Sequence, residues 1–84
     1  MIETNHHVTI ESVSEDRLTL QIDGKIVSAE WKKLSERLAK APRVARESIV
    51  ISPAGYGLHW PLIDEDLSID GILRDFGEER PGRG

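Results

Sequence analysis

The side chains best suited to acid–base chemistry are the histidines and the carboxylates of residues 64–70. His59 and Asp64 are near enough in sequence to form a pair, and imidazole exchanges protons near neutral pH. General acid–base catalysis needs an approach of about 2.6–3.2 Å to the reacting group and a partner that orients the base. One histidine with one carboxylate does not make a catalytic set. We therefore predict a structural or exposed His59, and a small enzyme around His59 is the least favoured alternative.

The acidic run that begins at Asp66 imitates a calcium-binding loop. Oxygen-bearing side chains fall at its first, third and fifth positions and a glycine at its sixth, as in an EF-hand. The twelfth position is Gly77, however, where calcium loops need a bidentate glutamate. We interpret the acids of residues 64–66 instead as compensation for the dipole at the start of a helix, and we predict no metal site.

The other candidates for chemistry have still weaker support. His6 and His7 lie in a terminus that we expect to be mobile, and neighbours in a strand point apart, so they would chelate a metal poorly. Gly55 and Gly57 flank Tyr56 without the strand–loop–helix order of a phosphate-binding loop. The sequence has no cysteine, which excludes disulfides, thiolate nucleophiles and cysteine-bound metals. We predict that the chain is not an enzyme and binds no cofactor.

The elements that position these residues begin with a strand meander. Leu18, Leu20 and Ile22 alternate with polar residues, as in a half-buried strand. Asp23-Gly24 then predicts a two-residue type I′ turn, since both central residues of that turn need positive φ. The turn fixes a register that puts the apolar side chains on one face, with Ile22 opposite Lys25, Leu20 opposite Val27 and Leu18 opposite Ala29.

An earlier strand at residues 8–11 precedes this hairpin. A three-residue loop at 15–17 would keep its apolar residues on the shared face. That loop predicts two pairs, with Ile10 opposite Ile22 and Ser12 opposite Leu20.

A helix over residues 31–41 follows the meander, because apolar residues recur at helical spacing. It ends before Pro42, since the residue that precedes a proline disfavours the helical conformation. Residues 43–47 are a connector or one further helical turn.

The remainder of the chain predicts a hairpin and a second helix. Strands at 48–52 and 58–60 flank a turn rich in glycine and proline. A helix over 66–76 follows, with Asp66 or Ser68 as its N-cap. The order β-β-β-α-β-β-α is typical of a small α+β domain with a mostly antiparallel sheet, and the order of strands in the sheet stays open.

The length of 84 residues suits one domain, which we place at residues 1–76. The tail at 77–84 is rich in glycine and charge, and we expect it to be disordered. The N-terminus lacks the basic start and apolar run of a signal peptide, and no stretch approaches the roughly 18 apolar residues that span a membrane. The absence of cysteine favours a reducing, cytoplasmic setting.

Charge is segregated along the chain. Residues 32–47 carry six basic and two acidic side chains, a net charge of +4, whereas residues 1–31 and 48–84 each carry a net charge of −4. Such a run usually covers a solvated helix face, but it also attracts an acidic partner. The candidate interaction surface consists of these bases and one exposed aromatic residue at a loop tip: Lys32, Lys33, Arg37, Lys40, Arg43, Arg46 and Tyr56. The other aromatic residues, Trp31, Trp60 and Phe76, are expected in the core.

The segment from Gly57 to Ile69 reads GLHWPLIDEDLSI, and Trp31, Leu34 and Leu38 lie upstream of it. In these residues the chain resembles the DUF2442 family, a domain of unknown function, over about residues 8–76. The resemblance implies a small bacterial α+β domain with a sheet and two helices. It also implies a regulatory role or a place in a toxin–antitoxin-like pair of small proteins. The family has no established catalytic residues to carry over.

These observations favour a non-enzymatic protein-interaction or regulatory module, an antitoxin-like partner of another small protein. Its partner would be the product of a neighbouring gene or a second copy of the chain. The alternative is a weak nucleic-acid-binding protein that uses the basic helix at 32–46, although the net charge of −4 opposes phosphate binding. No membrane partner is expected.

Overall fold

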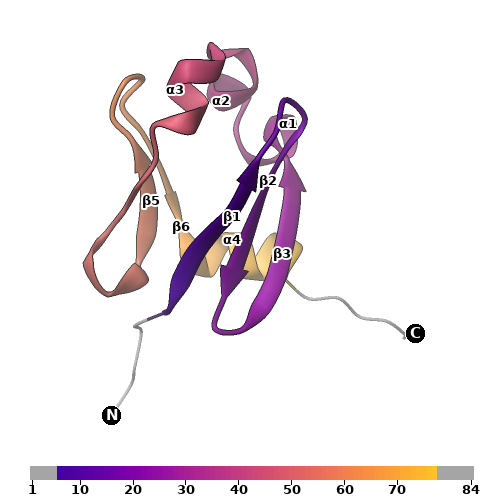
Figure 1. Cartoon of the computed structure of the whole chain (residues 1–84), viewed down its shortest axis with the longest axis vertical. Coiled ribbons are helices and arrows are strands. Elements are labelled where there is room, and N and C mark those ends of the chain that lie inside the picture. Colours follow the sequence, from indigo (N-terminus) through magenta and orange to yellow (C-terminus); the bar gives the residue numbers. More distant parts are fainter. Residues whose placement is uncertain (1–5, 78–84) are drawn as a thin grey trace.

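The computed structural model describes residues 6–77 and arranges them as two three-stranded antiparallel sheets with helices packed against them (Figure 1). The strand orders are β1-β2-β3 and β4-β5-β6. The predicted α+β class and antiparallel pairing are therefore confirmed. The predicted domain of 1–76 and tail of 77–84 each extend beyond the described residues. Within that range, no helix is long and apolar enough to cross a membrane.

The first sheet is the predicted meander of β1 (Val8–Val13), β2 (Arg17–Ile22) and β3 (Lys25–Glu30). Asp23 and Gly24 have φ of 52° and 87°, as a type I′ turn requires. The three predicted pairs between β2 and β3 are confirmed. The local chemistry of the turn is thus enough to set this register.

The register between β1 and β2 was predicted wrongly. Ser14 and Arg17 are hydrogen-bonded to each other through their main chains, so the loop has two residues, not three. In addition, the register shifts between Ile10 and Ser12, which leaves Glu11 as a bulge. Each change moves the pairing by one residue, and together they keep the apolar side chains of β1 on the core face. The observed pairs are Ile10 opposite Leu20 and Ser12 opposite Thr19.

The basic segment is three short helices instead of one helix over 31–41: α1 (Trp31–Leu34), α2 (Glu36–Lys40) and α3 (Arg43–Glu47). Ser35 interrupts the helix with extended backbone, at φ −168° and ψ 128°. Its Oγ accepts a hydrogen bond from the Leu38 N–H, which makes Ser35 the N-cap of α2. The stop before Pro42 is confirmed, and residues 43–47 form the further helical turn.

The second sheet contains β4 (Val50–Ile51), β5 (Gly57–Trp60) and a strand that was not predicted, β6 (Glu65–Ser68). A short 3-10 turn, η1 (Pro53–Gly55), connects β4 to β5. Because β6 pairs with β5 as far as Ser68, the last helix, α4 (Ile69–Phe76), begins three residues later than predicted. Ser68 is its N-cap and Asp70 the acid of its first turn, so the acids of residues 64–66 do not compensate its dipole.

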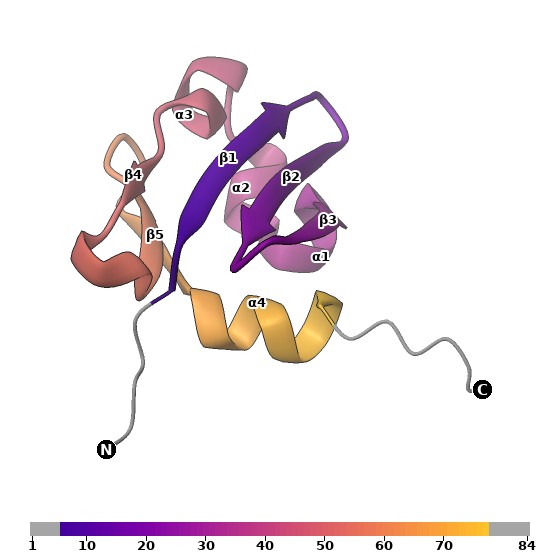
Figure 2. The same cartoon turned by 60° about the horizontal axis from the view of Figure 1, so that its bottom comes forward.

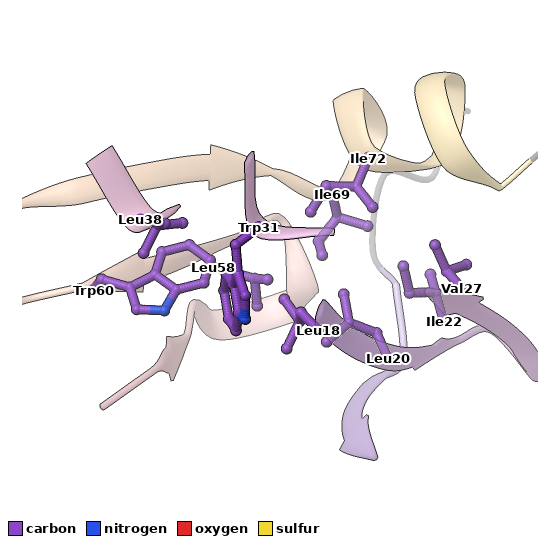
Figure 3. Close-up of a cluster of buried hydrophobic side chains, with 10 residues drawn as sticks. All are labelled: Leu18, Leu20, Ile22, Val27, Trp31, Leu38, Leu58, Trp60, Ile69 and Ile72. Carbon is purple, nitrogen blue, oxygen red and sulfur yellow. The ribbon is translucent and has the colours of Figure 1, made fainter. Parts of the chain in front are cut away.

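The core lies between the two sheets and the helices (Figure 3). Trp31 and Trp60, both predicted to be buried, meet edge to face with ring centroids 6.3 Å apart and an interplanar angle of 81°, a geometry that aromatic pairs favour. Phe76 is half-buried and packs against this cluster from its edge. The buried cluster comprises Leu18, Leu20, Ile22, Val27, Trp31, Leu38, Leu58, Trp60, Ile69 and Ile72.

The helices occupy two separate places around the sheets. Helices α1–α3 gather at one end of the molecule (Figure 1). Helix α4 contacts β5 and β6 of one sheet and β3 of the other, and it runs beneath both in Figure 2. Of the three helices in the basic segment, α1 borders α4, because residues of both helices line one hollow.

Candidate interaction surface

The lysines of the predicted surface form no ion pair with any residue that the structure describes. Lys32 and Lys33 on α1 and Lys40 on α2 are exposed. Within residues 6–77, none of their ammonium groups lies within ion-pair distance of a carboxylate. Three positive charges therefore stand on two short consecutive helices without a direct ion pair in the described residues, and they would attract anionic groups from outside.

Two arginines of the predicted surface are exposed but partly engaged. Arg37 donates a hydrogen bond to the Ile63 carbonyl at 2.8 Å, and its guanidinium lies 3.6 Å from the Glu65 carboxylate. Arg43 lies 3.4 Å from Glu47, one helical turn away. Exposed pairs such as the one between Arg43 and Glu47 are worth about 0–1 kcal/mol, so Arg43 can exchange its partner for an external carboxylate at small cost. Arg37 is held more firmly, because only 19% of the Glu65 side chain is accessible.

Arg46 has a different role from the other bases. It is half-buried, its Nη1 donates to the Ala41 carbonyl at 2.6 Å, and its guanidinium lies 5.7 Å from the centroid of the Trp31 ring. Its main-chain carbonyl accepts a hydrogen bond from the Trp60 indole at 3.1 Å. The structure thus places Arg46 in the packing between α3 and the tryptophan pair, and we leave it out of the contact set.

Two hollows flank α1. One, of about 160 Å³, lies between α1 and α4, with Lys33, Ser68 and Asp75 on its wall beside the apolar residues Leu34, Leu67, Ile72 and Phe76. The other, of about 380 Å³, has Lys32 and Trp31 on its wall together with three carboxylates, those of Glu15, Asp16 and Glu30. Helix α1 therefore separates the two hollows and carries a lysine beside each, and the hollow next to Lys33 is the more apolar of the two.

Tyr56 is exposed, as predicted, with 56% of its surface accessible. It follows η1, and the turn between β4 and β5 lies at the opposite end of the molecule from α1–α3 (Figure 1). The structure therefore does not bring Tyr56 together with the lysines. The predicted surface consists of two separate sites, of which only the one on α1–α3 carries a concentration of charge.

His59 pairs with Asp66 and not with Asp64. The strand register sets His59 opposite Asp66, and its Nδ1 lies 2.6 Å from the Asp66 Oδ1. Asp64 lies in the turn before β6, with φ of 53°. The pair is on an exposed sheet face, since 38% of the His59 side chain and 74% of the Asp66 side chain are accessible. Neither of the two hollows beside α1 includes this pair.

The His6 side chain contacts two aspartates from distant parts of the chain. Its Nδ1 lies 2.7 Å from the Asp23 Oδ2, and its Nε2 lies 2.9 Å from the Asp70 Oδ1. The contacts join residues 17 and 64 positions apart, so no local pattern could have indicated them. The acids that imitated a calcium loop are separated, with Asp66 on β6 and Asp70 on α4. Residues 6–77 contain no group of three or more side chains placed to hold a metal ion.

Comparison with known proteins gives one match. The family model for DUF2442, described as a protein of unknown function, matches residues 8–78, which includes every strand and helix described above. No curated protein and no solved structure matches the chain.

Proposed function

We propose that this chain, which belongs to the DUF2442 family of proteins of unknown function, is a non-enzymatic module that binds an acidic surface of another protein. The contact surface is the lysine ridge, which we define as Lys32, Lys33 and Lys40 with the exposed arginines Arg37 and Arg43. The partner is the product of a neighbouring gene in a bacterial, cytoplasmic, antitoxin-like pair.

The observation that carries this proposal is the contrast in charge between the lysine ridge and the rest of the chain. Residues 32–47 have a net charge of +4 within a chain whose net charge is −4. A fold gains little from exposed lysines without partners, and their mutual repulsion opposes packing of the segment. The same charges accelerate association with an anionic partner and set its orientation.

The hollows beside α1 add an apolar component to the contact. Protein interfaces bury an apolar centre inside a polar rim. The hollow lined by Leu34 and Phe76 could receive one apolar side chain, while Lys33 on its wall pairs with a carboxylate of the same partner. The arrangement favours a partner segment in which acidic residues flank an apolar one.

The experiment is a binding titration between this protein and the product of its neighbouring gene, followed by calorimetry and size exclusion. Reversal of two ridge charges in K32E/K33E should weaken the complex by about tenfold or more, because like charges at an interface cost at least 1.4 kcal/mol. The matched control is K25E. Lys25 is exposed and has no ion pair within residues 6–77, but it lies on β3, outside the ridge.

Three results would contradict the proposal. One is the absence of a complex at micromolar concentrations, and another is equal loss of affinity in K25E and K32E/K33E. The third is tight binding of DNA or RNA by the ridge, with a logarithmic salt slope of about −0.9 for each phosphate contact. This last outcome would assign the ridge to nucleic acid.

A further inference from the structure

His6 ties the N-terminal segment to three other parts of the molecule. Its ring contacts Asp23 in the turn between β2 and β3 and Asp70 in the first turn of α4. Its main-chain N–H donates to the Ala54 carbonyl in η1 at 2.9 Å. Only 15% of its side chain is accessible, although both carboxylates are well exposed.

Both ring nitrogens of His6 must donate in this arrangement. An ionised carboxylate only accepts hydrogen bonds, and each nitrogen faces one carboxylate oxygen at hydrogen-bond distance. Neutral imidazole has a single N–H, whereas imidazolium has two. Loss of the proton therefore removes one bond and leaves a nitrogen lone pair directed at a carboxylate. With both carboxylates ionised, the geometry therefore favours the protonated ring.

The backbone around His6 reinforces this contact. The N–H of His7 donates to the Asp23 Oδ1, and the N–H of Asp23 donates to the His7 carbonyl, both at 2.9 Å. Gly55 lies so close that a Cβ on it would be 2.0 Å from the His6 carbonyl oxygen. Residues 6 and 7 therefore sit in a defined seat formed by the β2–β3 turn, η1 and the start of α4.

We propose that His6 is a pH-controlled latch, which holds residues 6 and 7 in this seat when its ring is protonated and releases them when the ring loses its proton. The charged groups that act on the ring are Asp23 from the turn and Asp70 from α4, whereas η1 contributes a backbone carbonyl. This device is independent of the lysine ridge and of any partner.

The direction of the pH effect follows from the charges. The hydrogen bonds to Asp23 and then Asp70 raise the pKa of His6 above its ordinary value of 6.5. Stability from a raised histidine pKa is fully present below the unfolded value and is lost as pH rises through the folded one. The His7 N–H and the His6 ring lower the pKa of Asp23 below 3.8, and its contribution is lost only as pH falls through that lowered value. The latch is thus closed between these two transitions.

The test is an NMR titration of the histidine rings, with hydrogen exchange of the Asp23 amide as the readout of release. We expect His6 to titrate above its ordinary value of 6.5, and Asp70→Asn to lower the pKa of His6. The matched control Asp66→Asn removes the carboxylate beside His59 and should leave the pKa of His6 unchanged. Exchange at Asp23 should accelerate as His6 deprotonates, beyond the intrinsic rise of exchange with pH.

A second variant distinguishes pH-dependent release of residues 6 and 7 from a general loss of stability. His6→Gln has no titratable ring, so exchange at Asp23 should follow the intrinsic pH dependence alone. A His6 pKa at or below 6.5, or an Asp70→Asn protein in which the pKa of His6 is unchanged, would overturn the latch. Equal pH dependence of Asp23 exchange in the His6→Gln variant and in the unmodified protein would overturn it as well.

Discussion

The charged groups around His6 and those of the lysine ridge differ in whether they have partners within the protein. At His6, a cation is shared between two carboxylates and most of its side chain is covered. On α1 and α2, three exposed ammonium groups have no ion pair within residues 6–77. The difference separates charges that hold the fold together from charges that remain available to a partner. Substitutions should therefore affect stability in the first region and binding in the second.

Arg46 should show the largest effect on stability. It lies in the basic segment, but its contacts are with the fold, like those of His6. Arg46→Ala removes the donor to the Ala41 carbonyl and the cation over Trp31. We expect a loss of about 1–3 kcal/mol in the free energy of unfolding, measured by urea denaturation. Arg43→Ala is the control and should change stability by less than about 0.5 kcal/mol. Equal effects of the two substitutions would remove the distinction.

The second largest effect on stability is expected at His6, and it should exceed the effect at His59, the other histidine that contacts an aspartate. His6→Ala should lower the urea midpoint more at pH 6 than at pH 9, because the bonds to Asp23 and Asp70 need a protonated ring. His59→Ala removes one exposed contact between neighbouring strands, so its effect should be smaller at both pH values. A His6→Ala loss that is independent of pH would place the contribution of this residue in its packing.

The smallest effect on stability is expected in the lysine ridge. Lys32→Ala combined with Lys33→Ala should change the free energy of unfolding by less than about 0.5 kcal/mol, since neither ammonium group has a partner in the described residues. Urea denaturation at low salt is the most demanding measurement, because surface charge effects are least screened there. A clear destabilisation would show that the fold uses these lysines.

The parts of the fold that could be predicted depend on neighbouring residues. Asp23-Gly24 specifies its turn by the φ values it tolerates, and the alternation of apolar residues around it then sets one register. Pro42 ends a helix because of the residue before it. In each case the deciding interaction lies within a few positions of the chain.

The missed features depend on distant residues. Ser35 fits a helix by spacing, but it caps α2 and donates to Glu65, 30 positions away. The acids before Leu67 have the composition of a helix start, and only pairing with β5 makes them a strand. For the candidate site, the exposure of the lysines could be predicted from their spacing. The packing of Arg46 against the tryptophan pair and the contacts of His6 with two aspartates could not be predicted, because both depend on tertiary structure.

The most direct test of the central claim is the salt dependence of the affinity between this protein and its neighbouring gene product. If the lysine ridge makes the contact, the dissociation constant should rise steadily from low to physiological salt, because exposed charges are screened. The K32E/K33E variant should then bind weakly at low salt and lose most of this dependence, while K25E retains it. A complex whose affinity is the same at every salt concentration and in all three proteins would contradict the claim.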